Sequence, residues 1–150
     1  MVAYNFQQQF APAVKSGEKL QTIRALGKRR HAKSGDYLQL YTGMRTKSCR
    51  KLLDSICISS EPIGISGDMQ VFVGGAGETI KILPIEEVEK LAIADGFDSA
   101  EAFFTFFGRM HGLPFLGVLI KWKFPNSAAE HRNASAPDPP QYAIASPQLP

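Results

Sequence analysis

Cysteine is scarce in this sequence, with only Cys49 and Cys57 among 150 residues. Two cysteines that stand eight residues apart make neither a disulfide framework nor a metal site. In one continuous strand they would share a face about 26 Å apart, at about 3.3 Å per residue, so we expect no local disulfide. A reducing compartment is therefore expected, and the sequence predicts a cytoplasmic protein.

Long hydrophobic runs are also missing. The longest clean apolar run covers residues 115–120, far short of the roughly 20 residues of a membrane-spanning helix. The opening residues MVAYNFQQQF lack the basic-then-apolar pattern of a signal peptide. His31 and His111 stand alone, without the spacing of metal ligands. We therefore expect no membrane partner, no metal and no cofactor.

The charge is unevenly distributed. Residues 15–51 hold eleven basic residues and two acidic ones, a net charge of +9. The rest of the chain holds six basic and twelve acidic residues, a net charge of −6, which gives the overall +3. Such a basic segment is either a solvated face or a surface for a polyanion, and its density favours contact with phosphate or nucleic acid.

The composition changes at Pro125. Residues 125–150 hold six of the ten prolines and none of the ten phenylalanines. Such a segment cannot bury enough apolar surface to offset the entropy of the chain, so we expect a flexible tail rich in Pro, Ala and Ser. Residues 1–124 are long enough for one compact domain.

Short segments rich in β-branched and aromatic residues predict strands in this domain. They are residues 2–6, 19–24, 37–41, 52–65 (with a break at Pro62 and Gly64), 71–73, 79–83 and 116–123. A helical turn or two is expected before Gly17, which is a natural helix C-cap.

Two helices are expected near the end of the domain. The first begins at Pro84, where apolar residues follow at three- and four-residue spacing. The second begins after Asp98, which resembles a capping box with Glu101. Its apolar face is expected in the core; it consists of Phe103, Phe104, Phe106, Phe107 and Met110. The sequence therefore predicts an α+β fold, a small curved sheet or barrel with a helix pair packed against it.

The segment GEKLQTIR, residues 17–24, carries the most specific pattern. Gly17, Lys19, Thr22 and Arg24 fit a signature of G-x-K, a variable acidic or hydroxyl position three residues on, and then x-R. Together with KSGDYLQLYTG downstream, this segment resembles the ASCH family, whose members have a PUA-like barrel associated with RNA. The resemblance extends over roughly residues 4–123. It implies a PUA-like small β-barrel with a helix pair.

Threonine at the variable position is similar to the branch that contains bacterial N(4)-acetylcytidine amidohydrolases. In that branch a lysine, a threonine and a downstream carboxylate carry catalysis, which implies Lys19, Thr22 and Asp95 here. The implied reaction removes the acyl group from N(4)-acetylcytidine and releases cytidine and the acid. Each residue also has a plainer interpretation: Lys19 as a phosphate contact, Thr22 as an ordinary strand residue, and Asp95 as the turn residue before Gly96.

Strand geometry sets a condition on this site. In a regular strand Thr22 and Arg24 share one face, whereas Lys19 points to the other. Lys19 and Thr22 therefore open onto a common site only if Lys19 belongs to the turn after Gly17. Lysine acts as a base only where burial or neighbouring positive charge lowers its pKa.

The basic segment predicts a surface for RNA or a modified nucleoside. The expected contacts are Arg24, Lys28, Arg29, Arg30, Lys33 and Arg45. For Arg24, a hydrogen bond inside the domain is the alternative. Tyr37 and Tyr41 face the same way along one strand, either to stack on bases or to fill the interior of the barrel.

Other functions stay open beside the hydrolase. The same cleft suits a non-catalytic RNA-binding module, or a ribonuclease of the kind that some ASCH domains are thought to be. No histidine pair or metal cluster supports a ribonuclease directly. A regulatory protein that binds other proteins through its Pro-rich tail is the third possibility.

Overall fold

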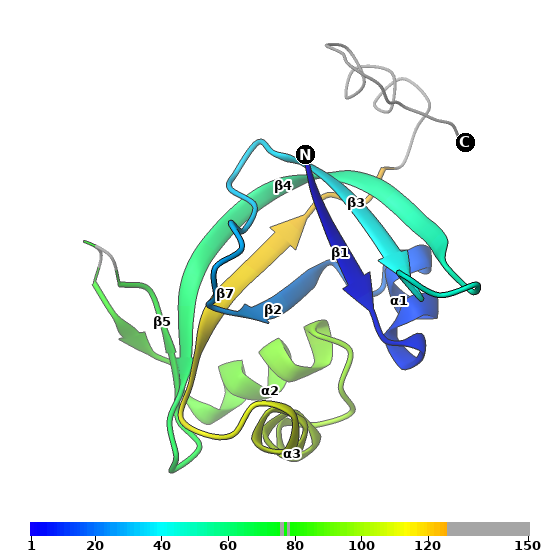
Figure 1. The fold of residues 1–150 in the computed structure, drawn as a ribbon. Coiled ribbons are helices and arrows are strands. Elements are labelled where there is room, and N and C mark those ends of the chain that lie inside the picture. Colours follow the sequence, from blue (N-terminus) through cyan, green and yellow to red (C-terminus); the bar gives the residue numbers. More distant parts are fainter. Residues whose placement is uncertain (76, 78, 126–150) are drawn as a thin grey trace.

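The computed structural model describes residues 1–75, 77 and 79–125 and has an α+β fold with three α-helices and a mixed sheet (Figure 1). The strands are β1 (Val2–Phe6), β2 (Gln21–Ala25), β3 (Tyr37–Thr42), β4 (Arg50–Ile65), β5 (Val71–Val73), β6 (Lys81–Ile82) and β7 (Phe115–Trp122). The helices are α1 (Ala11–Ser16), α2 (Ile85–Ala94) and α3 (Ala100–Met110), and a 3-10 turn, η1 (Gln8–Phe10), leads into α1. Apart from Pro125, the predicted tail lies outside the described residues.

The long, curved strand β4 joins the two halves of the sheet (Figure 1). Its first half pairs antiparallel with β3, which in turn pairs parallel with β1. Its second half pairs antiparallel with β7 and with β5, and β7 pairs antiparallel with β2. The expected break in this strand is wrong, because pairing with β7 continues through Pro62 and Gly64.

The sheet does not close into a barrel in the described part of the chain. β1 is paired only with β3, and β2 is paired only with β7, so β1 and β2 are open edges. Side chains that leave β2 and the segment after it reach main-chain oxygens of β1: Arg24 donates to Asn5 O at 2.8 Å, and Arg29 donates to Ala3 O. The gap between the two edges is therefore bridged by arginine side chains, and we call it the β1–β2 seam.

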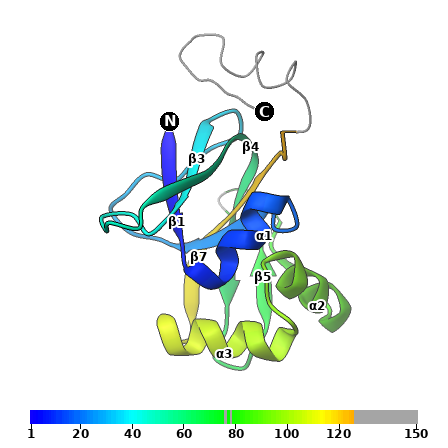
Figure 2. The same ribbon diagram turned by 90° about the vertical axis from the view of Figure 1, so that its right-hand side faces the viewer.

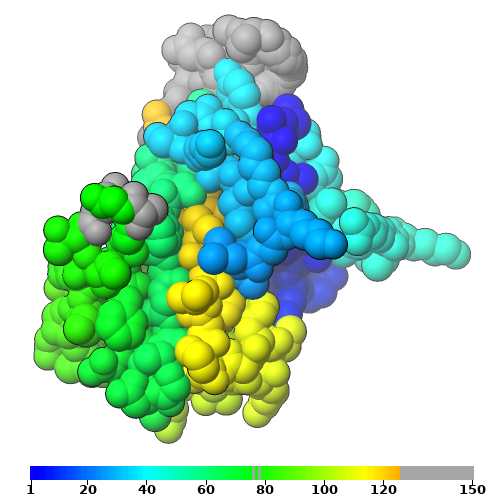
Figure 3. Space-filling model, turned by 60° about the vertical axis from the view of Figure 1, so that its left-hand side comes forward, coloured from blue at the N-terminus to red at the C-terminus, as the bar shows by residue number. Residues whose placement is uncertain are grey.

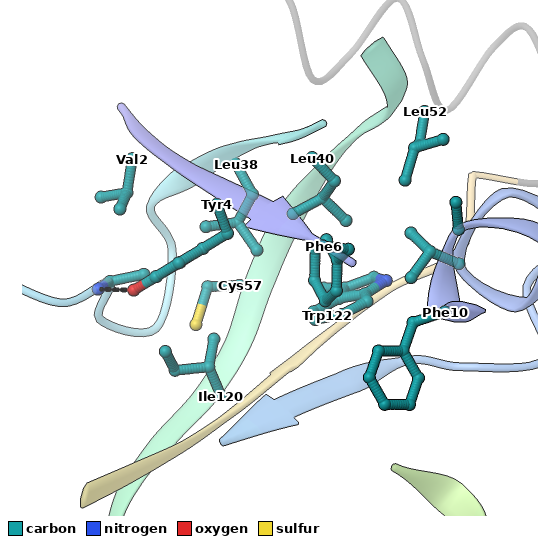
Figure 4. Packing of buried hydrophobic residues seen from close by; sticks show 13 residues of the cluster. Val2, Tyr4, Phe6, Phe10, Leu38, Leu40, Leu52, Cys57, Ile120 and Trp122 are labelled. Atoms are coloured by element: carbon teal, nitrogen blue, oxygen red, sulfur yellow. Dashed lines mark hydrogen bonds between the residues drawn. The ribbon is translucent and has the colours of Figure 1, made fainter. Parts of the chain in front are cut away.

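One hydrophobic cluster lies between the strands (Figure 4). We call it the strand cluster; its buried members are Val2, Tyr4, Phe6, Phe10, Ala11, Val14, Ala32, Leu38, Leu40, Leu52, Cys57, Ile120 and Trp122. Figure 4 shows the Phe6 and Trp122 rings side by side, and they meet edge to face with centroids 5.9 Å apart. Both cysteines are free: Cys57 is buried in this cluster and Cys49 is exposed.

A second cluster lies between the sheet and the helices α2 and α3, which sit against one side of it (Figure 2). We call it the helix cluster, and Phe103, Phe107 and Phe115 lie at its centre. β7 serves both clusters because its side chains alternate: Ile120 faces the strand cluster, while Leu119 faces the helix cluster. This sheet-and-helices architecture confirms the predicted fold class in its coarse form.

The start and the face of α3 differ in part from the prediction. Phe103, Phe104 and Phe107 are buried as predicted, but Met110 is 52% exposed. The N-cap is Ser99, whose hydroxyl accepts a hydrogen bond from the Ala102 amide at 3.1 Å, so the predicted cap at Asp98 is wrong. Serine and aspartate are equally good N-cap residues, so the sequence does not distinguish Asp98 from Ser99. The path of the chain decides which of them caps the helix.

The tyrosines of β3 lie on the outer face of the sheet. Leu38, Leu40 and Thr42 are buried on one face of this strand, whereas Tyr37 and Tyr41 are half-buried on the other. Since side chains alternate along a strand, the tyrosines face away from the strand cluster. The interpretation that they fill the interior is therefore wrong.

Candidate active site

Lys19 lies between α1 and β2, outside the regular strand. α1 ends at Gly17, whose φ of +90° suits a C-cap glycine, and β2 begins only at Gln21. The Lys19 amide donates to Ala13 O at 2.9 Å, which ties this turn back onto α1. The side chain is only 3% exposed. Lys19 thus occupies the turn that the strand-parity argument required.

The Lys19 ammonium is paired with Asp95, 76 residues further along the chain. Its Nζ donates to Asp95 Oδ1 at 3.1 Å and also to the Asp95 main-chain oxygen. Gln21 Nε2 donates to the same Oδ1 at 3.5 Å. Asp95 is the C-cap of α2, so it is also the turn residue of the plainer interpretation. The structure therefore brings together two of the three predicted catalytic residues.

Gly96 makes this close approach possible. Its φ is +100°, and a Cβ there would lie 2.9 Å from the Phe10 ring and 3.3 Å from Lys19 Cδ. The Phe10 and Phe6 rings enclose the ammonium, with centroids 5.1 and 5.8 Å from Nζ. Aromatic faces attract a cation in this range, so Lys19 is held by a carboxylate and by two ring faces.

Burial shifts the pKa of each partner in the direction that favours its neutral form. It lowers the pKa of the Lys19 ammonium, and the Asp95 carboxylate offsets part of this shift. It raises the pKa of the Asp95 carboxyl, and Lys19 offsets part of that shift. The two pKa values thus approach each other, which favours transfer of a proton within the pair. A buried lysine of this kind suits the role of a base.

Thr22 is held by Arg24 on the face of β2 that meets the strand cluster. Thr22 is 5% exposed and pairs with Ile120 of β7. Arg24 Nε donates to Thr22 Oγ1 at 3.0 Å. Because the hydroxyl oxygen accepts this bond, its own proton remains available for a base.

The Arg24 side chain is half-buried against two aromatic rings of β1. Its guanidinium is 5.1 Å from the Tyr4 ring centroid and 4.8 Å from that of Phe6. Burial lowers its pKa to about 10, so it is charged at neutral pH. These contacts support the internal role for Arg24, and its contact with RNA stays a prediction.

The two pairs of residues meet at Phe6. Its ring contacts both the Lys19 ammonium and the Arg24 guanidinium. Positive charge on Arg24 also lowers the pKa of Lys19. Among the described residues no hydrogen bond joins Lys19 to Thr22. The site thus consists of a Lys19–Asp95 pair and a Thr22–Arg24 pair that share one aromatic neighbour.

The remaining predicted RNA contacts fall into two groups. Arg29 lies 5.0 Å from the Tyr4 ring centroid and reaches across the β1–β2 seam, and Arg30 is paired with Asp36 at 2.7 Å. The other three are exposed and form no ion pair with any described residue; they are Lys28, Lys33 and Arg45. Only this second group remains free for a phosphate.

The sequence did not point to several side chains that build the site. Gln21 and Asn5 are polar residues with no pattern to distinguish them, and Phe6 and Phe10 read as ordinary core residues. His31, which had no predicted role, lies with Nε2 at 2.9 Å from Ala25 O and Nδ1 at 3.0 Å from the Tyr4 hydroxyl. The first contact requires a proton on Nε2, so in the neutral imidazole Nδ1 accepts from the Tyr4 hydroxyl.

The described residues contain no cluster of three or more His, Cys, Asp or Glu side chains that suits a metal ion. None of the helices in that part of the chain is long and apolar enough to cross a membrane. No protein-family model, curated protein or solved structure matched this chain when it was compared with them.

Proposed function

We propose that this chain is an ASCH-type domain with PUA-like architecture and that it is an amide hydrolase. Its proposed substrate is an acylated cytidine, namely N(4)-acetylcytidine. The observation that carries the proposal is the buried contact of Lys19 with Asp95, which shares the Phe6 ring with the Arg24 that holds the Thr22 hydroxyl. The GEKLQTIR motif carries the family resemblance, and the fold agrees with that family in its coarse α+β form, although the sheet is open in the described part of the chain.

The proposed chemistry uses the three residues in sequence. Lys19 first becomes neutral by passing a proton to Asp95, and the Thr22 oxygen then forms a bond to the acyl carbon while its own proton passes to Lys19. The bond from the acyl carbon to N4 then breaks, and the proton passes through the Lys19–Asp95 pair to the leaving amine. Water hydrolyses the acyl–threonine ester, which releases the acid and restores the hydroxyl.

The test is deacylation of N(4)-acetylcytidine by the purified full chain, followed by chromatography. Thr22→Val keeps the shape but removes the hydroxyl, and Lys19→Met removes the amine. We expect each to lower kcat by at least about 10²-fold, as loss of a nucleophile or a general base does. Thr22→Ser is expected to retain turnover, because it keeps the oxygen.

Two exposed residues supply matched controls. Lys15→Met and Thr105→Val make the same chemical changes outside the site and should leave kcat unchanged. Circular dichroism of each variant separates loss of chemistry from loss of fold. No turnover by the unmodified chain, or full turnover by folded Lys19→Met, contradicts the hydrolase.

A second candidate, a non-catalytic RNA-binding module, is favoured by a separate observation. Five exposed cations in the segment 28–50 form no ion pair with the described residues; they are Lys28, Lys33, Arg45, Lys47 and Arg50. Unpaired cations at this density suit phosphates, and binding through them weakens with salt. In this candidate the buried Lys19–Asp95 pair only joins the turn before β2 to the end of α2.

A further inference from the structure

The outer face of β1, β3 and β4 carries polar and aromatic side chains in rows. We call it the outer face; its side chains are Ala3, Asn5, Tyr37, Gln39, Tyr41, Lys51, Asp54 and Ile56. None of these residues is buried. The register places Asn5, Tyr41 and Lys51 in one row, and Ala3, Gln39 and Asp54 in the next. An amide, an aromatic ring and an ammonium thus stand next to one another.

Basic segments lie at both ends of β3, which runs through the middle of this face. Residues 26–36 precede β3 and residues 43–49 follow it. Figure 3 shows the segment 43–49 projecting from the body of the molecule, beyond the segment 26–36. The first segment supplies Lys28 and Lys33, and the second supplies Arg45 and Lys47. The outer face is therefore flanked by positive charge.

The segment 43–49 is held in a defined conformation. Thr46 Oγ1 donates to Gly43 O at 2.6 Å and accepts from the Ser48 amide at 3.1 Å. The Met44 amide donates to Asn5 Oδ1 at 2.9 Å, which ties the segment to the outer face. Arg45 has a φ of +67°, a conformation that L side chains rarely adopt. Because these bonds fix the backbone, a ligand that binds its cations has to order only their side chains and not the main chain.

We propose that the outer face binds single-stranded RNA, with bases on Tyr41 and Gln39 and phosphates on the flanking cations. This inference rests on the second candidate function, nucleic-acid binding, and not on the hydrolase. Unstacked bases fit a ring and amide groups on an open sheet, whereas the bases of a duplex are already stacked. An anionic membrane would instead require an exposed apolar surface, and only Ile56 on this face offers a large aliphatic side chain.

Substitution of Tyr41 provides the decisive test. Lys51 Nζ lies 5.9 Å from the centroid of the Tyr41 ring and 3.2 Å from Asp54 Oδ1, so a base stacked there meets an ammonium that is paired with a carboxylate. Tyr41→Leu keeps apolar bulk but removes the ring, and Tyr41→Phe keeps the ring. The probe is a labelled single-stranded RNA of about ten nucleotides. We expect Tyr41→Leu to weaken its binding by about 5- to 150-fold and Tyr41→Phe to bind it as the unmodified chain does. Fluorescence anisotropy measures both.

The cations give a second, separable readout. Replacing Arg45, Lys47 and Arg50 with alanine should weaken binding to RNA and to heparin and reduce the salt slope by about 0.7 for each lost phosphate contact. Tyr41→Leu should leave heparin binding unchanged, since it removes no charge. The matched control replaces Lys90 and Arg109 on the helices and should change neither affinity.

The outcomes separate this inference from the functions proposed above. If the triple variant loses RNA binding but Tyr41→Leu binds normally, the outer face is not the RNA-binding site. The result then indicates general binding of polyanions through the cations. Equal affinity for duplex RNA, or binding to anionic lipid vesicles but not to RNA, also overturns it. Tyr41→Leu should hydrolyse N(4)-acetylcytidine at the rate of the unmodified chain, so a failed hydrolase does not affect this test.

Discussion

At the scale of single residues, the Lys19–Asp95 pair sets the character of the site. Their side chains are 3% and 6% exposed, so both groups have lost most of their contact with water. A buried pair of this kind adds little net stability, but removing one partner leaves an uncompensated buried charge. The pair is therefore easily converted to neutral groups and costly to break.

We predict that Asp95→Asn lowers the free energy of unfolding by about 3–5 kcal/mol at neutral pH, because Lys19 then lacks a counter-charge. Urea denaturation measures the change. Asp54→Asn is the matched control, since Asp54 pairs with Lys51 at 3.2 Å on the surface, where such pairs contribute about 0–1 kcal/mol. Equal losses in the two variants would contradict a buried, charged Lys19.

The same variant should become more stable as the pH rises. Burial keeps the pKa of Lys19 in the folded state below its ordinary value of 10.5 in the unfolded chain. Between these two values the unfolded chain binds more protons than the folded chain, so stability increases with pH in that window. The dependence should be weaker in the unmodified chain, where the carboxylate raises the pKa of Lys19. Urea denaturation across alkaline pH, with no such rise in the variant, would refute the shift.

Sequence reasoning reached these residues unevenly. The motif singled out Lys19 and Thr22, but the strand expected over residues 19–24 begins only at Gln21, and the place of Lys19 in the turn after Gly17 was a condition of the site, not a prediction. Asp95 came only from the family resemblance, because an Asp-Gly pair at a helix end is common for reasons of turn geometry. Its contact with Lys19 depends on how the end of α2 packs beside β2, and no local pattern encodes that packing.

At the scale of the elements, strand positions were predictable and sheet closure was not. Segments rich in β-branched and aromatic residues located β3 and β7, but the sequence left open which face of β3 is buried, and the interpretation that its tyrosines fill the interior was wrong. Closure depends on whether the β1 and β2 edges come within hydrogen-bonding distance, which is a property of twist and of strand length. The arginines that bridge the β1–β2 seam looked like surface charges in the sequence, because only the fold places Asn5 O beside Arg24.

We predict that Arg24→Leu loosens the β1–β2 seam. The change leaves Asn5 O and Thr22 Oγ1 without their charged donor, and bonds of this kind contribute about 1.5–3 kcal/mol. Native-state hydrogen exchange should show faster exchange in β1 and β2 than in the unmodified chain. Protection where β4 pairs with β7 should persist, because those strands are paired by main-chain hydrogen bonds.

Arg29→Leu serves as the comparison for this seam. Arg29 also reaches a main-chain oxygen of β1, but it is exposed, so water replaces its bond to Ala3 O at little cost. We expect a smaller effect on exchange than for Arg24→Leu. Equal acceleration of exchange throughout the chain in Arg24→Leu would indicate global destabilisation and not a local role at the seam.

At the scale of the whole molecule, two clusters organise one domain around a shared sheet. β7 contributes to both, since Ile120 and Trp122 lie in the strand cluster and Phe115 and Leu119 lie in the helix cluster. The candidate active site lies where the two clusters meet, because Phe10 of the strand cluster contacts Phe97, which also contacts Phe103 of the helix cluster. Positioning of Asp95 next to Lys19 therefore depends on the complete domain.

We predict that a chain ending at Pro125 retains the fold and both proposed activities. Among the residues that the structure describes, every buried member of the two clusters lies between Val2 and Trp122. Phe124 is retained because its ring lies against Gly17, where a Cβ would come within 2.8 Å of it. Thermal unfolding should shift by less than about 4 °C, which corresponds to about 1 kcal/mol in a domain of this size. Hydrolysis of N(4)-acetylcytidine and binding of single-stranded RNA should match those of the full chain. Loss of either activity with the fold intact would instead assign it to residues 126–150, as expected of a protein that works through its Pro-rich segment.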